Sequence, residues 1–151
     1  MAAIAVEFPL AVHLGDVRAM FMDARFYEQL AILERAETVE LSLNDHTARW
    51  TRRLRLGFLA LTAEDTLSWE TDTQAQLQSN VSGPGVSGHL TAVLTIAEKH
   101  SSQAASTATL AGDYDLSLPA HLTAFAGAAT TQLAQVISLR GAASRRWARA
   151  D

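Results

Sequence analysis

Residues 116–140, LSLPAHLTAFAGAATTQLAQVISLR, contain the change of hydrophobic period that decides the fold. The pattern before Pro119 is strand-like, and roughly thirty residues follow Pro119 without another proline. The side chains of one stripe then recur at i, i+3, i+4 and i+7, as on a helix with one buried face. They are Leu122, Phe125, Ala126, Ala129, Leu133, Val136, Ile137 and Arg140. Pro119 suits a first helical turn, where its missing N–H has no helical partner. We therefore predict one long C-terminal helix that begins near Pro119.

Most of the preceding chain has the two-residue alternation of β-strands. A first strand is predicted at residues 4–12, and Asp16 and Asp23 can cap two short helices after it. Strand patterns then continue to Leu118, with turns at Asn44-Asp45 and at residues 82–85 (SGPG), while the state of residues 56–61 is left open. This order predicts an α+β fold with a curved antiparallel sheet of about six to seven strands, and the long helix lies across that sheet.

The composition limits the classes of function. A length of 151 residues fits one domain, which we assign to residues 1–151. The formal net charge of −4 argues against nucleic-acid binding, and the lack of cysteine excludes disulfides and thiol chemistry. Residues 1–7, MAAIAVE, lack the basic start of a signal peptide, and no stretch approaches the eighteen or so apolar residues of a membrane span. We therefore expect a cytoplasmic protein.

The order of elements resembles the helix-grip fold of the START-like superfamily, also called SRPBCC. The likeness extends over nearly the whole chain and includes the opening, where residues 4–12 are followed by Gly15-Asp16-Val17-Arg18-Ala19-Met20-Phe21. The final helix that starts at a proline is similar as well. Within the superfamily the chain is most similar to small uncharacterised bacterial families. The superfamily includes pollen-allergen, polyketide-cyclase and lipid-transfer members, and it has no universal catalytic motif to carry over.

Metal and acid–base chemistry receive little support from the residue pattern. The five histidines do not pair at the spacing of i and i+2 or i and i+4 that a metal site needs, so no metal and no cofactor are predicted. Asp113 and Asp115 share one face of the last strand, opposite its apolar residues, and His89 is likewise expected on the outer face. Glu64-Asp65 is interpreted as a solvated strand end. We predict no catalytic residue.

Aromatic side chains indicate where a ligand would bind. Trp50, Trp69 and Tyr114 fall on inward faces of different strands, and Phe125 falls on the inward face of the helix. The residues between them are small, which leaves either a void or a close approach of backbones; they are Ala108 and Gly112 on the sheet and Ala126 and Ala129 on the helix. The predicted ligand site consists of Trp50, Arg52, Trp69, Tyr114, Phe125 and Ala129.

Arg52 is unusual because alternation places it on the apolar face with Trp50 and Leu54. A buried arginine must be paired. Either Arg52 lies at the mouth of the cavity and binds an anionic head group, or a bulge turns it outward.

The functional expectation is the non-catalytic binding of an apolar small molecule that is lipid-like or polyketide-like. Two alternatives stay open: a protein-interaction module with a collapsed cavity, and a cyclase- or hydrolase-like enzyme. The C-terminal arginines Arg145, Arg146 and Arg149 flank Trp147, and this segment could make weak peripheral contact with an anionic membrane. Their simpler role is to stabilise the helix dipole. The oligomeric state is not predicted.

Overall fold

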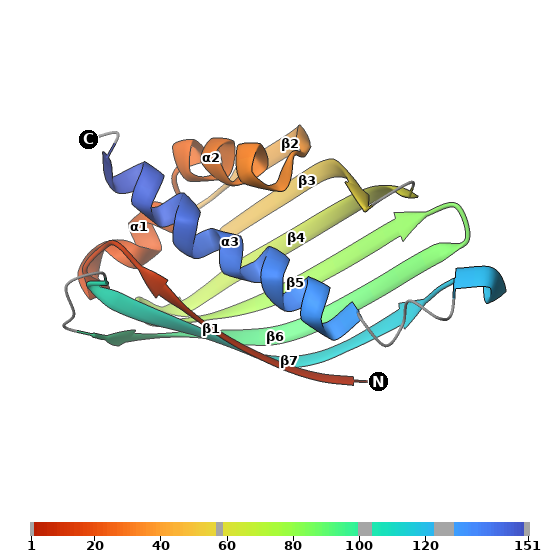
Figure 1. Cartoon of the computed structure of the whole chain (residues 1–151). Coiled ribbons are helices and arrows are strands. Elements are labelled where there is room, and N and C mark those ends of the chain that lie inside the picture. Colours follow the sequence, from red (N-terminus) through yellow and green to blue (C-terminus); the bar gives the residue numbers. More distant parts are fainter. Residues whose placement is uncertain (1, 57–58, 100–103, 123–128, 150–151) are drawn as a thin grey trace.

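The computed structural model describes residues 2–56, 59–99, 104–122 and 129–149. A seven-stranded antiparallel sheet in the order β1-β7-β6-β5-β4-β3-β2 curves around the C-terminal helix (Figure 1). The elements are β1 (Ala2–Leu10), η1 (Leu14–Asp16), α1 (Val17–Phe21), α2 (Ala24–Glu34), β2 (Glu37–Leu43), β3 (Thr47–Leu56), β4 (Leu59–Thr71), β5 (Gln74–Gly83), β6 (Val86–Glu98), β7 (Ser106–Ser117) and α3 (Ala129–Arg149).

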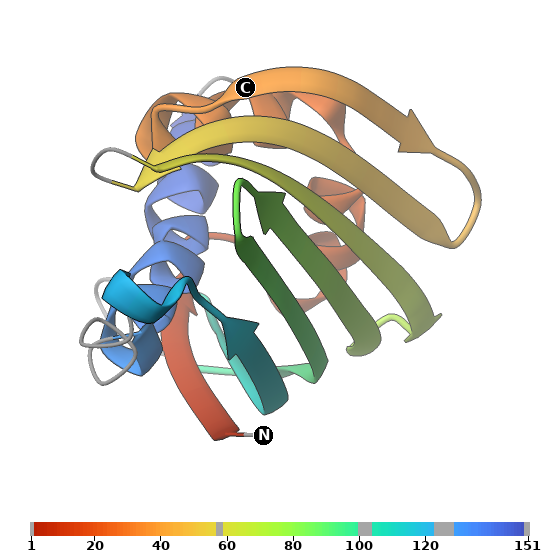
Figure 2. The ribbon, with the colours of Figure 1, turned by 90° about the vertical axis from the view of Figure 1, so that its right-hand side faces the viewer.

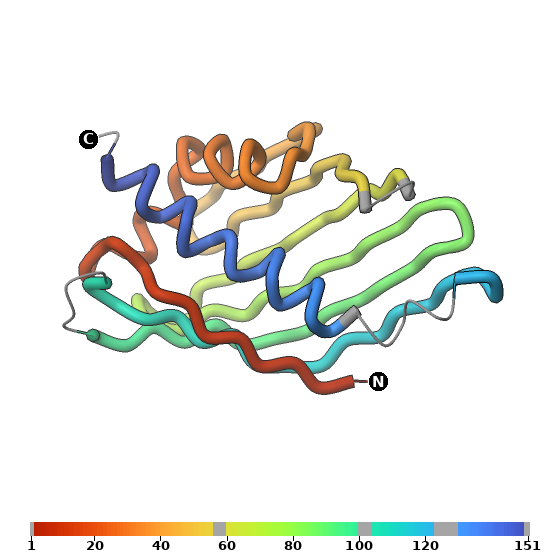
Figure 3. Tube along the Cα trace, viewed as in Figure 1, coloured from red at the N-terminus to blue at the C-terminus, as the bar shows by residue number. Residues whose placement is uncertain are grey.

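All three α-helices lie on the concave side of the sheet. Figure 2 shows the strong curvature of the sheet, whose hollow faces α3. α3 crosses the sheet diagonally and packs against α2 on one side and β1 on the other (Figure 3). Gly141 permits the close approach to β1, because a Cβ at this position would lie 2.7 Å from the carbonyl oxygen of Pro9.

Alternation along the strands places the core on the concave face. In β1 the side chains of Ile4, Val6, Phe8 and Leu10 are buried, and the intervening residues are exposed. The register carries this pattern across the sheet, so that one row contains Trp50, Asp65, Ser79, Leu90 and Tyr114 on consecutive strands. Aromatic side chains from α1, α2 and the sheet pack against one another in the interior; they are Phe21, Phe26, Tyr27, Trp50 and Trp69.

Local sequence signals account for several boundaries. The Asp23 carboxylate accepts a hydrogen bond from the Arg25 backbone N–H at 3.0 Å and so caps α2, as predicted. The Asn44 side chain accepts from the backbone N–H groups of His46 and Thr47, which forms the turn between β2 and β3. Gly85, with φ of +71°, completes the predicted turn between β5 and β6.

The predicted α+β architecture is confirmed at the level of a curved antiparallel sheet with a long last helix. Of the open segment at residues 56–61, Leu56 ends β3 and residues 59–61 begin β4, while residues 57 and 58 lie outside the described residues. Pro119 is followed by a 3-10 turn at residues 120–122, and the Leu122 N–H donates to the Pro119 oxygen at 2.8 Å. Residues 123–128, which include Phe125 and Ala126, lie outside the described residues.

Gly112 lies tightly against the neighbouring strand of the sheet. A Cβ at Gly112 would lie 2.0 Å from the Thr91 carbonyl oxygen and 2.5 Å from the Ala92 Cα. The backbone of β6 therefore occupies the space that a side chain at Gly112 would need. Ala108, which lies further along β7, is fully buried.

Candidate functional site

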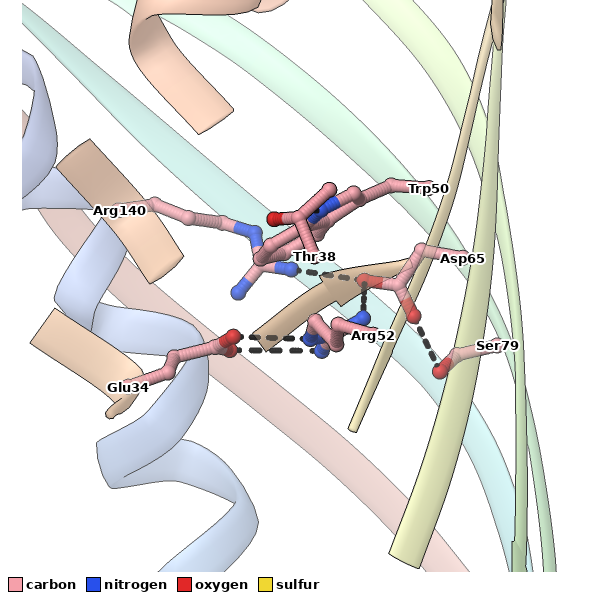
Figure 4. Close-up of polar contacts among 7 residues, drawn as sticks. All are labelled: Glu34, Thr38, Trp50, Arg52, Asp65, Ser79 and Arg140. Atoms are coloured by element: carbon pink, nitrogen blue, oxygen red, sulfur yellow. Dashed lines mark hydrogen bonds and ion pairs between the residues drawn. The ribbon is translucent and has the colours of Figure 1, made fainter. Parts of the chain in front are cut away.

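Five polar side chains from five elements converge inside the fold (Figure 4). They are Glu34 at the end of α2, Arg52 on β3, Asp65 on β4, Ser79 on β5 and Arg140 on α3. We call this set the polar cluster. The three strand residues face inward because they alternate with solvent-facing residues such as Arg53 and Glu64. The side chains of the four charged members are only 2–11% exposed.

Arg52 is held from two directions. Its Nε and Nη2 atoms donate to the two carboxylate oxygens of Glu34 at 2.8 and 3.3 Å, and its guanidinium lies 4.1 Å from the ring centre of Trp50. Its Nη1 atom lies 3.1 Å from Asp65 Oδ2, which is an ion pair. Arg52 is therefore buried and paired, and the alternative that a bulge turns it outward is wrong.

Asp65 joins the sheet to the C-terminal helix. Its Oδ1 accepts from Ser79 Oγ at 2.6 Å, and its Oδ2 accepts from Arg140 Nη2 at 3.0 Å. Burial opposes ionisation of the carboxyl, but the charges of Arg52 and Arg140 and the Ser79 hydrogen bond outweigh it. The pKa of Asp65 is consequently lowered below its ordinary value. Asp65 is an ionised structural partner with both oxygens occupied.

Two donors of the polar cluster lack an acceptor in hydrogen-bond geometry among the described residues. The Nη1 atoms of Arg52 and Arg140 are buried and lack a hydrogen-bond partner among the described residues, since the Arg52 contact with Asp65 has ion-pair distance but not hydrogen-bond geometry. A cavity of about 20 Å³ lies beside Asp65 and Arg140. Its other walls are mainly apolar and include Phe8, Leu94 and Ile137. This space holds about one water-sized atom.

A larger, open groove lies at the ends of β1, β5, β6 and β7. Its volume is about 660 Å³. Val81, Gly88, Tyr114 and Leu116 line it from the concave face. The residues that alternate with them on the opposite face also line it; they are Asn80, Ser87, His89, Asp115 and Ser117. Leu116 is 39% exposed, whereas concave-face residues nearer the start of β7, such as Leu110, are buried. Tyr114 shares a hydrogen bond with Thr130 near the start of α3. The groove therefore lies beside the N-terminal part of the helix.

The structure separates the predicted ligand residues. Trp50 lines the cavity and donates from Nε1 to Thr38 Oγ1 at 3.2 Å. Trp69 is buried beside Phe21, and its Nε1 has no hydrogen-bond partner within the described ranges. Tyr114 lines the groove instead. Phe125 lies outside the described residues. Ala129 is the first residue of α3, but its side chain is not among the described ones.

Glu34, Asp65, Ser79 and Arg140 were not predicted as site residues. The interpretation of Asp65 as a solvated strand end is wrong, because its side chain is only 8% exposed. The sequence contains one signal for the inward position of Asp65. Asp65 shares one face of β4 with apolar residues, which are Ala63, Leu67 and Trp69.

The other candidate residues face solvent. Asp113, Asp115 and His89 are exposed, as predicted, and His89 hydrogen-bonds to the side chains of Asn80 and Thr91. Within the described part of the chain, no group of three or more His, Asp or Glu residues could hold a metal ion. No described helix is both long and apolar enough to cross a bilayer.

The C-terminal arginines have different surroundings. Arg145, Arg146 and Arg149 are exposed on α3. Trp147 is partly buried and donates from Nε1 to Asp23 Oδ2 at 3.0 Å, with the Arg25 guanidinium 5.8 Å from its ring centre. Trp147 therefore attaches the end of α3 to the start of α2.

Comparison with solved structures reveals the same fold in proteins of very different sequence. A protein from Thermus thermophilus aligns with a TM-score of 0.69 at 11% identity over 99% of this chain and 100% of its own. A conserved protein from Geobacillus kaustophilus aligns at 0.59 and 12% identity over 95% and 94% of the two chains. An uncharacterised protein from Rhizobium leguminosarum aligns at 0.59 and 9% identity over 92% and 93%.

At these identities the structures are evidence for the fold alone. No family model matches the sequence, and no curated protein matches it either. The chemistry of the site must therefore be argued from its own residues.

Proposed function

We propose that this chain is a helix-grip domain of the START-like superfamily, and that it binds an apolar small molecule between the sheet and α3 without catalysis. The element order supports this proposal, since a curved sheet with a helix across its hollow surrounds a mostly apolar interior. The fold is also the one found in the three solved structures.

The open groove is the observation that carries the proposal. Its volume of about 660 Å³ falls in the range of roughly 300–1,000 Å³ of small-molecule sites. Val81, Tyr114 and Leu116 are accessible there, although the same face is densely packed beneath α1 and α2.

Catalysis has less support than binding. A general acid or base needs a pKa near neutrality and access to the substrate. The pKa of Asp65 is lowered, and its oxygens already accept hydrogen bonds from Ser79 and Arg140. Burial raises the pKa of Tyr27 above its ordinary value, and its hydroxyl donates to the Phe21 carbonyl oxygen at 2.8 Å. Both groups keep one protonation state near neutral pH.

A protein-interaction module is the second candidate, and the edge strand β2 favours it. Six of its seven residues are exposed, including the large apolar side chains of Val39 and Leu43. An exposed apolar edge strand can pair with a strand of another chain. If this candidate is correct, apolar probes will not bind, and Val39→Lys will abolish an association that sedimentation detects in the wild type.

Titration with N-phenylnaphthylamine, an uncharged fluorescent probe, tests the ligand proposal. We expect saturable binding with quenching of tryptophan emission. Leu116→Gln should weaken binding because it places a polar group in the groove. Leu43→Gln is a matched control, since Leu43 is 37% exposed but lies on β2, away from the groove. Absence of saturable binding, or equal loss in both variants, would contradict the proposal.

A further inference from the structure

We infer that the ligand of this site is an uncharged molecule that presents a carbonyl oxygen to the buried guanidinium group of Arg140. The inference rests on the proposed function, and it names the chemical class of the ligand.

The charges of the polar cluster already balance. Glu34 and Asp65 each contribute one negative charge, and Arg52 and Arg140 each contribute one positive charge. A ligand carboxylate or phosphate would add an uncompensated charge to a buried region. Burial of an unpaired charge is far more costly than burial of a neutral polar group. The cluster therefore favours an uncharged ligand.

The unused hydrogen-bonding capacity consists of donors. Both oxygens of Glu34 accept from Arg52, and both oxygens of Asp65 accept from Ser79 or Arg140. The Nη1 atoms of Arg52 and Arg140 are the buried arginine donors without hydrogen-bond partners in the described structure. A guanidinium only donates, so the matching ligand atom is an acceptor. A carbonyl oxygen needs no donor in return, whereas a hydroxyl would bury an unsatisfied O–H.

The cavity gives this oxygen a place. It borders Arg140 and Asp65, and its volume of about 20 Å³ accommodates one oxygen atom or one water. The remaining walls are mostly apolar and suit the adjoining part of an apolar chain.

The same row of the sheet contains residues of both the cavity and the groove. Asp65, Ser79, Leu90 and Tyr114 are register partners on consecutive strands. Strands are about 4.8 Å apart, so roughly 14 Å separates Asp65 of the cavity from Tyr114 of the groove. An extended apolar chain of that length reaches from the groove to Arg140 if it displaces the side chains packed between them, such as Leu90, which is 5% exposed.

Competition among three related molecules tests this inference on the wild-type protein. Methyl laurate, laurate and dodecane share a similar apolar chain, but they carry an ester carbonyl, a carboxylate and no oxygen, respectively. Each is titrated against the complex of the protein with N-phenylnaphthylamine. We expect methyl laurate to displace the probe at a concentration at least about tenfold lower than either competitor, as a hydrogen bond to a charged donor allows.

Arg140→Met removes the donor but keeps a long apolar side chain. We expect this variant to bring the concentration of methyl laurate that displaces the probe to within about twofold of that of dodecane. The displacing concentration of dodecane should not change. Arg145→Met is the matched control on the exposed face of α3 and should keep the wild-type order. If Arg140→Met fails to fold, the order in which the three competitors displace the probe from the wild-type protein still tests the inference.

The outcomes separate the two proposals. Equal displacement by all three molecules, or tighter binding of laurate, would overturn the carbonyl inference and leave apolar ligand binding standing. Absence of saturable probe binding would overturn the proposed function and the inference with it.

Discussion

Arg140 and Asp65 are 75 positions apart in the sequence, yet Arg140 Nη2 lies 3.0 Å from Asp65 Oδ2 in the interior. This contact attaches α3 to the centre of the sheet. Arg52 reaches the same carboxylate oxygen at 3.1 Å, so one buried carboxylate contacts two cations that come from separate elements. Removal of that anion affects both.

Asp65→Asn should therefore destabilise the fold strongly. The substitution leaves Arg52 and Arg140 with Glu34 as the only acidic partner in the polar cluster, and an uncompensated buried charge costs about 3–5 kcal/mol. Urea unfolding at neutral pH would measure the loss. Glu64→Gln is the control, because the neighbouring Glu64 pairs with exposed Arg49 and should cost less than about 1 kcal/mol. Similar losses in both variants would show that the buried network is not essential.

Stability should fall in acid, partly through Asp23. The hydrogen bond from the Arg25 side chain is the main cause that lowers the pKa of Asp23 from 3.8 to about 2. The unfolded chain therefore takes up this proton at a higher pH than the folded chain. The contribution is complete above the unfolded value and is lost as the pH falls toward 2.

Urea unfolding across that pH window would detect the effect. Asp65 acts in the same direction, because its pKa is also lowered. Asp23→Asn should make the decline of stability shallower than in the wild type. An unchanged slope would mean that the Asp23 contacts with Arg25 and Trp147 do not persist in solution.

The parts of the fold that were predictable depend on local signals. Two-residue alternation identified strands such as β1, β6 and β7, and Asp23 identified the start of α2. The 3.6-residue stripe, which includes the buried Ile137, identified α3. Alternation with Trp50 also placed Arg52 on the inward face, although an outward turn through a bulge was left open. Each of these inferences needs only residues close in sequence.

The partners inside the fold were not predictable in the same way. Glu34 reaches Arg52 from the last turn of α2, and Arg140 reaches Asp65 from the final helix. Which ends of these elements meet depends on the curvature of the sheet and on the packing of α3. Asp65 was misinterpreted because Glu64 beside it suggested a solvated pair, although only Glu64 faces solvent.

Gly112→Ala should be poorly tolerated, because its Cβ would lie within 2.0 Å of the Thr91 carbonyl oxygen. Backbone atoms of β6 cannot move away as a flexible side chain can, and overpacking of this kind costs about 1–3 kcal/mol or more. Gly15→Ala provides the control, since no atom lies within 4 Å of a Cβ there. Thermal unfolding should show a clear loss only for Gly112→Ala. A fully stable Gly112→Ala protein would mean that β6 and β7 are further apart.

Ser144 secures α3 against the end of β1. Its Oγ accepts from the Ala11 backbone N–H at 3.0 Å and donates to the Gly141 carbonyl oxygen at 2.6 Å. Ser144 is fully buried, so Ser144→Ala leaves the Ala11 N–H without its partner and should cost about 1–3 kcal/mol.

Ser138→Ala is the matched control on the same helix. The Ser138 hydroxyl donates only to the Ala134 carbonyl oxygen one turn earlier, and alanine has the higher helix propensity, so little stability should be lost. Hydrogen exchange distinguishes the two variants further, because only Ser144→Ala should accelerate exchange of the Ala11 amide. Equal protection of that amide in both variants would mean that Ser144 does not hold β1 to the helix.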